Sequence, residues 1–159
     1  MASPKGKRPQ FDVVLARRNI ISGLGATKTL SLKDSNSIIL LDRAAGIVIT
    51  LPTAKPGAVF EFMATVSVTS NAYKIITGAA TEFLLGDLVS IDTDTSNAVA
   101  EFTGNGTSHI AVNMTAAASN ALGGLKGTHL KFTCLSNTLW MVEGTNQAGG
   151  TVATPFSTS

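Results

Sequence analysis

The chain has 159 residues, which is enough for one hydrophobic core, and only 14% of them are charged. No apolar run approaches the roughly 20 residues that cross a bilayer, and no apolar segment of the secretory type follows the basic N-terminus. The single cysteine, Cys134, excludes an internal disulfide and argues against a zinc cluster. We expect a soluble protein with no membrane partner, whose charge-poor surface suits packing against neighbours.

The N-terminal residues differ from the rest of the chain in charge and composition. The first eighteen contain five Lys and Arg residues against the single Asp12, a net charge of +4, whereas the remainder is slightly acidic. Pro4 and Pro9, followed by the Ser-Gly-Leu-Gly sequence at 22–25, are typical of an extended arm and a flexible joint. We therefore divide the chain into a basic N-terminal arm and hinge (1–27), a β-domain (28–146) and a C-terminal surface tail (147–159).

The β-domain begins with two β-rich runs, residues 38–41 and 47–51, on either side of a five-residue turn. Gly46 supplies the permissive backbone of a turn, and Pro52 ends the second run because it cannot donate a ladder hydrogen bond. The pattern predicts a hairpin.

Strict alternation of apolar and polar residues over 60–69 predicts a half-buried strand. Turn-forming residues separate the further expected strands, which are 73–77, 83–91, 98–103, 109–114, 129–135 and 139–143. Only residues 116–122 could form a short helix. Many short strands without long amphipathic helices predict an all-β fold, an antiparallel β-sandwich or barrel-like domain with an extended N-terminal arm.

Candidate chemical groups are few, and each has a simpler structural interpretation. Strand alternation places His109 and His129 on polar faces, without the ligands or carboxylate partners that catalysis or metal binding needs. The same alternation makes Cys134 a core residue. Trp140 is a core or interface residue, or alternatively a sugar-stacking platform. We predict no catalytic residue, no metal site and no cofactor.

The polar sequence at 92–97, with Asp92 and Asp94, could offer oxygen ligands to calcium, but it lacks the glycine and the terminal glutamate of the helical calcium loop. The alternative is that these side chains bind the backbone of their own turn. Nucleic acid is not the expected partner of the arm either, because Phe11 is its only aromatic residue and five positive charges are few for tight phosphate binding.

The order of several segments resembles the head decoration proteins of tailed phages, also called capsid cement proteins. The segments are KTLSLKDSNSIILLD, AAGIVITLPTAKPG, FEFMATVSVTSNAYKIIT, KFTCLSNTLWMVEGTN and TVATPFS, within residues 28–159. The resemblance implies a small all-β protein, made in the host cytoplasm, that binds the outer surface of the capsid. It further implies that the protein clamps major capsid subunits, commonly as a homotrimer, and that it is not an enzyme.

The arm is the part that we expect to reach a neighbouring subunit, since an added strand gains backbone hydrogen bonds at a sheet edge. The expected partner-binding residues are Lys5, Lys7, Arg8, Phe11, Arg17, Arg18 and Ile20. The alternative function is a carbohydrate- or host-surface-binding β-module of a phage tail or spike, although such a site normally shows several exposed aromatic residues.

Overall fold

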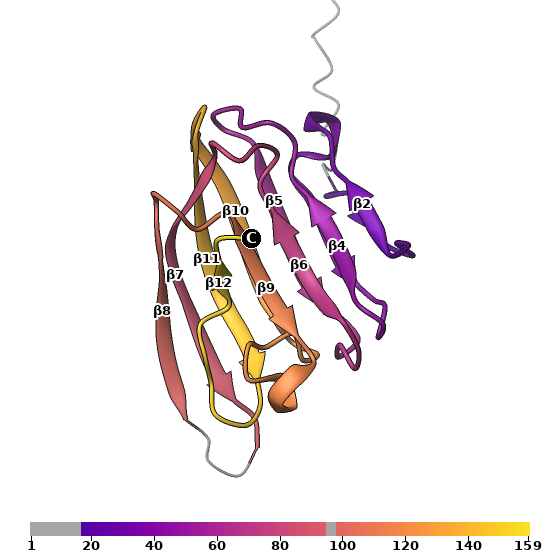
Figure 1. The fold of residues 1–159 in the computed structure, drawn as a ribbon. Helices are drawn as coiled ribbons and strands as arrows, with labels where there is room; N and C mark the ends of the chain where they lie inside the picture. The colour runs from indigo at the N-terminus through magenta and orange to yellow at the C-terminus, as the bar shows by residue number, and fades with distance from the viewer. Residues whose placement is uncertain (1–16, 95–97) are drawn as a thin grey trace, which may run out of the picture.

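The computed structural model describes residues 17–94 and 98–159, which form two β-sheets and two short 3-10 helices, η1 (Leu32–Asp34) and η2 (Ala117–Asn120). Figure 1 shows the sheets as two layers. The larger sheet has seven strands, in the order β1 (Ile20–Ile21), β3 (Ser37–Leu41), β5 (Val59–Ala64), β10 (His129–Ser136), β11 (Leu139–Ala148), β7 (Phe83–Asp92) and β8 (Val99–Asn105). The smaller has five, in the order β12 (Phe156–Ser157), β9 (Ala111–Thr115), β6 (Ala72–Ile76), β4 (Ile47–Thr50) and β2 (Thr27–Thr29).

The strands from β1 to β6 alternate between the two sheets, so that this part of the chain winds around the core. Odd-numbered strands join the larger sheet and even-numbered strands the smaller one. As a result β1, β3 and β5 run parallel to one another, and so do β2, β4 and β6. From β7 onward most neighbours are antiparallel, although β7 itself runs parallel to β11.

The predicted hairpin over 38–51 is therefore wrong. Its first run is β3 of the larger sheet and its second is β4 of the smaller sheet. The turn between them carries the chain from one layer to the other, and Gly46 adopts a φ of +81° there. A Cβ atom at Gly46 would also collide with the backbone of Ala72 at the start of β6. Alternation shows which side chains of a strand face the core, but it does not show which strand lies beside it.

The prediction of an all-β fold is confirmed, whereas the prediction of antiparallel sheets is wrong, because both sheets are mixed. The expected strands at 73–77, 83–91 and 129–135 match β6, β7 and β10 to within a residue. Two strands end at other residues than expected. β5 ends at Ala64, before the end of the expected strand over 60–69. β11 runs on to Ala148, past the expected end at residue 143 and into the segment assigned to the tail.

The inward faces of both sheets share one core. Phe62 of β5 and Phe132 of β10 meet edge to face with ring centroids 5.3 Å apart, and Phe60 packs against Trp140 at 6.0 Å. Aromatic pairs in these arrangements add to the stabilisation from buried apolar area. Trp140 and Cys134 are both buried, as the sequence predicted.

The C-terminal segment returns to the smaller sheet. Phe156 of β12 is only 6% exposed, and β12 pairs with β9. Its ring stacks on the imidazole of His109 with centroids 5.6 Å apart. Phe156 therefore packs within its own chain, and the expectation that it belongs to a surface tail is corrected.

The Asn146 side chain fastens the 122–128 segment to the larger sheet. Its amide nitrogen donates to Ser90 Oγ (3.1 Å) and to the carbonyl oxygen of Leu122 (3.0 Å), and its oxygen accepts from the Gly124 N–H (3.2 Å). Gly123, with a φ of +94°, lies so close that a Cβ atom there would collide with this amide. The buried amide is thus satisfied only because the neighbouring position is a glycine.

The buried carboxyl group of Glu82 joins the two sheets. Glu82 Oε1 accepts from the N–H of Ala54, in the loop after β4, at 2.8 Å. Glu82 Oε2 accepts from the N–H of Gly78, after β6, and from the Trp140 indole N–H of β11, each at 3.2 Å. Glu82 is only 1% exposed, so its carboxyl group is shielded from water and depends on these three donors for its hydrogen bonds.

Removing the Glu82 carboxyl group should destabilise the whole domain. In Glu82→Ala the N–H groups of Ala54, Gly78 and Trp140 lose their acceptor, so we expect the free energy of unfolding to fall by about 3–5 kcal/mol in urea denaturation. Glu82→Gln keeps the shape and one acceptor oxygen, and it should lose about 1–2 kcal/mol. The exposed Glu101→Ala is the control, and a Glu82→Ala variant as stable as this control would contradict the assignment.

Candidate functional site

Four exposed apolar side chains lie on the outer face of the larger sheet, where β11, β7 and β8 run side by side. Met141 of β11, Leu85 and Val89 of β7 and Val99 of β8 are each between 37% and 66% exposed. Met141 and Leu85 are register partners, as are Val99 and the half-buried Ile91. Asp87 and Glu143 are register partners between the Met141–Leu85 pair and Val89, so apolar and acidic side chains alternate across this surface. Exposed apolar side chains bordered by polar ones are typical of a surface that another protein covers. We call the five apolar residues the apolar face.

The same surface carries negative charge. Asp87 of β7 and Glu101 of β8 point outward, and neither forms an ion pair with a residue in the described part of the chain. Glu143 of β11 pairs with Lys131 of β10 at 2.8 Å. The apolar face therefore suits a partner that brings apolar and basic side chains together.

A charged cluster holds the N-terminal edge of this sheet. Arg18 Nη1 donates to Glu61 Oε1 at 2.7 Å, Arg18 Nε donates to the carbonyl oxygen of Asn36 at 3.1 Å, and His129 Nε2 lies 3.4 Å from Glu61 Oε2. Burial raises the pKa of the Glu61 carboxyl group, but hydrogen bonds and charge from Arg18 and His129 outweigh it, so that the pKa lies below its ordinary value of 4.5. The cluster therefore holds the residues just before β1 against Glu61 of β5.

The structure places three of the seven residues expected to bind a partner. Arg17 is exposed, Arg18 belongs to the charged cluster, and Ile20 of β1 is 58% exposed although its backbone pairs with β3. The other four, Lys5, Lys7, Arg8 and Phe11, lie outside the described residues. Arg18 thus already has a partner within its own chain, while Arg17 and Ile20 present their side chains at the sheet edge.

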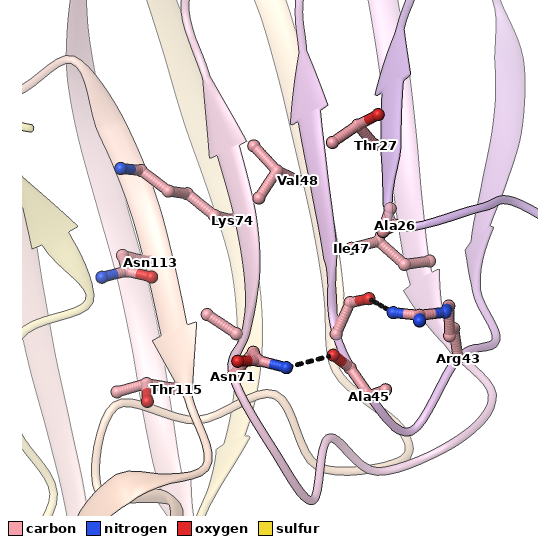
Figure 2. Close-up of a pocket in the computed structure, with 12 residues that line it drawn as sticks. Ala26, Thr27, Arg43, Ala45, Ile47, Val48, Asn71, Lys74, Asn113 and Thr115 are labelled. Carbon is pink, nitrogen blue, oxygen red and sulfur yellow. Dashed lines mark hydrogen bonds between the residues drawn. The ribbon is translucent and has the colours of Figure 1, made fainter.

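A pocket lies on the outer face of the smaller sheet, at the beginning of β4 and β6. The pocket has a volume of about 550 Å³ and crosses four strands, β9, β6, β4 and β2. Figure 2 shows Lys74 reaching from β6 toward Asn113 of β9, with Arg43 at the opposite side and Val48 between them. This size is within the range of sites for small organic ligands.

The polar groups of this pocket are incompletely paired. Neither Lys74 nor Arg43 forms an ion pair with a described residue, and no Asp or Glu lines the pocket. Arg43 Nη1 donates to the carbonyl oxygen of Gly46 at 2.7 Å, which leaves its other N–H groups available. The Oδ1 atom of Asn113 is buried and has no hydrogen-bond partner within residues 17–94 and 98–159. The pocket therefore combines positive charge with an unused acceptor.

The remaining candidate groups have structural partners. Burial raises the pKa of the Cys134 thiol, which donates to the carbonyl oxygen of Ser136 (3.1 Å), so the group is an unreactive core thiol. Asp92 Oδ1 accepts from the Asp94 N–H (3.0 Å), and Asp94 Oδ2 accepts from the Gly150 N–H (2.7 Å), as expected for side chains that bind nearby backbone. The rest of that polar loop, residues 95–97, lies outside the described residues.

Two further findings concern metal ions and membranes. Within residues 17–94 and 98–159, no three His, Cys, Asp or Glu side chains form a group that could hold a metal ion. No helix in this described part of the chain has the length and apolar character to span a membrane.

The pocket is the site that sequence reasoning missed. Alternation places Lys74 and Asn113 on outward faces of their strands, and this signal is readable in the sequence. What brings them together is the register of β6 with β9, where Lys74 and Asn113 are direct partners. Arg43 joins them only because the turn before β4 crosses between sheets.

Comparison of the chain with protein-family models, with curated proteins and with solved structures finds no match.

The charged cluster predicts a component of stability that disappears in acid. Because the folded-state pKa of Glu61 lies below 4.5, the ionised carboxylate stabilises the fold above that pH, and the contribution is lost as the pH falls through the folded-state value. We expect urea denaturation to show that the free energy of unfolding of the wild type falls by about 1 kcal/mol between about pH 5 and about pH 3 because of this group. Glu61→Gln should lack this part of the decrease. Arg18→Met should remove most of the same component. An unchanged acid slope in both variants would contradict the assignment.

Proposed function

We propose that this chain is a structural virion protein, a β-sandwich module with a basic N-terminal arm that binds the outer surface of a tailed-phage capsid. It stabilises the capsid by bridging major capsid subunits, and the proposal assigns it no catalytic residue and no cofactor. The observation that carries the proposal is the apolar face, because large apolar side chains on a regular sheet surface favour a protein that works by being covered. The resemblance of residues 28–159 to capsid cement proteins supports the same conclusion.

The arm supplies the contact with capsid subunits. Arg18 fixes the start of the described chain beside β3 and β5, at the edge of the larger sheet. The basic residues earlier in the arm, Lys5, Lys7 and Arg8, can pair with acidic groups on a neighbouring subunit. Repeated over a symmetric shell, weak contacts of this kind become strong through high effective concentration.

The apolar face supplies the contact between copies in a homotrimer. Permanent interfaces between copies are more apolar than transient ones, which fits Leu85, Val89, Val99 and Met141. Asp87 and Glu101 on the same surface, which form no ion pair with a described residue, attract the positive arm of an adjacent copy.

Removing residues 1–16 tests the arm without touching a described strand. We expect the melting temperature to stay within about 2 °C of the wild type, because the core and every described strand pair remain, while cosedimentation with capsids stripped of the protein is lost. A matched variant with Lys5, Lys7 and Arg8 changed to Gln separates charge from length, and it should bind at least tenfold more weakly. Undiminished capsid binding by the truncated protein would refute the role of the arm.

Placing charge on the apolar face tests the trimer. Light scattering should give the wild type three times the 16.4 kDa mass of one chain, and Val89→Glu together with Met141→Glu should give a monomer of unchanged fold. The control is Thr50→Glu, on the outer face of the smaller sheet, which should leave the trimer intact. A wild type that remains monomeric at micromolar concentration would rule out this use of the face.

A further inference from the structure

We propose that the pocket on the smaller sheet binds an acidic saccharide, an oligosaccharide that contains uronic-acid-type sugars. The inference goes beyond the proposed function and does not rest on it, since a module on a capsid surface and a module elsewhere could equally carry such a site. It rests on three observations: two cations that form no ion pair with a described residue, the Asn113 Oδ1 acceptor without a partner in the same part of the chain, and the position of both in a pocket that crosses four strands.

The charge of the pocket selects an anion. Among the described residues, Lys74 and Arg43 are the only charged ones that line it, so this part of the chain supplies no negative charge to balance them there. Figure 2 shows these side chains at opposite sides of the pocket, with the aliphatic Val48 and Ala26 in between. A compact anion such as inorganic phosphate would be best held by cations that converge on it. Separated cations instead suit an elongated ligand with carboxylates spaced along it.

The polar side chains of the pocket suit a ligand that donates hydrogen bonds as well as carrying carboxylates. Asn113 Oδ1 is buried and has no hydrogen-bond partner among the described residues, so a ligand reaches it only when the Asn113 side chain turns toward the pocket. An ionised carboxylate has no hydrogen to donate to this oxygen, whereas a sugar hydroxyl has. The hydroxyl groups of Thr27 and Thr115 line the same pocket and can exchange hydrogen bonds with further sugar hydroxyls.

The position in the sheet argues against a peptide or a nucleic acid. Extended peptides bind to sheet edges through backbone hydrogen bonds, but three of the four strands at the pocket, β4, β6 and β9, each pair with strands on both sides, and only β2 is an edge strand. Most of the pocket therefore offers side chains rather than backbone groups. Single-stranded nucleic acids stack their bases on aromatic residues, and the lining has none. The exposed aliphatic surface of Val48 instead fits the C–H face of a sugar ring.

Titration calorimetry with the full chain can test the proposal. The probes are tetragalacturonic acid, the neutral maltotetraose and tetraglutamate, all at about 50 mM salt so that screening is modest. We expect tetragalacturonic acid to bind with a Kd of about 1 mM or tighter, and the other two to bind at least tenfold more weakly. Amide shifts in an NMR titration should fall on β4, β6 and β9.

Variants connect that binding to the pocket. Lys74→Met should weaken tetragalacturonic acid binding about tenfold, and Asn113→Asp, which keeps the side-chain size but adds negative charge beside Lys74, should weaken it at least as much. Lys55→Met is the matched control, because it removes the same charge in the loop beyond the opposite end of β4, and it should bind within twofold of the wild type. Thermal melting of each variant shows whether it is folded.

Several results would overturn the inference. If tetragalacturonic acid does not bind, the inference is wrong. Equal binding of maltotetraose would show that charge does not select the ligand, and equal binding of tetraglutamate would show that sugar hydroxyls do not. If Lys55→Met and Lys74→Met lose the same affinity for tetragalacturonic acid, binding depends on the net charge of the protein and not on the pocket.

Discussion

The packing of the two sheets depends on the buried carboxyl group of Glu82. Its three donors come from the chain just after β4, from the chain just after β6, and from β11 in the opposite layer. Backbone groups beyond the end of a strand leave the ladder and need another acceptor. The buried Glu82 side chain holds the chain that follows two strands of the smaller sheet against Trp140 of the larger sheet, and so links the winding part of the chain to the later strands.

Much of the strand content could be predicted from the sequence, but the pairing could not. Alternation located β5, β6, β7 and β10 because each has one buried face. The winding of β1 to β6 left no repeat to detect, since its loops differ in length: Ile20 pairs with Ile38, 18 residues further on, whereas Ile38 pairs with Glu61, 23 residues further on. A five-residue turn is compatible with a hairpin and with a crossing between layers, and only the shared core decides between them.

The candidate sites were predictable to different extents. The basic arm is visible as a charge asymmetry, yet the sequence does not show that Arg18 is held by Glu61, 43 residues away. The pocket could not be inferred because Arg43, Lys74 and Asn113 come from three separate segments that strand register brings to one surface. Alternation places Glu82 on the same face as Leu84 and puts Asp87 on the opposite face with Leu85. Because both faces carry apolar residues, the pattern does not show which of the two carboxyl groups is buried.

The two outer faces of the domain differ in a way that constrains how it can be oriented in an assembly. The larger sheet carries the apolar face, and its edge strand β1 belongs to the N-terminal arm (1–27), so the proposed protein contacts concentrate on that layer. The smaller sheet faces the other way and carries the pocket, whose two cations form no ion pair with any residue that the structure describes. A partner covering the larger sheet would leave the pocket open to solvent. Protein contacts and saccharide binding can therefore coexist on one copy, and the apolar-face variants should bind tetragalacturonic acid as the wild type does.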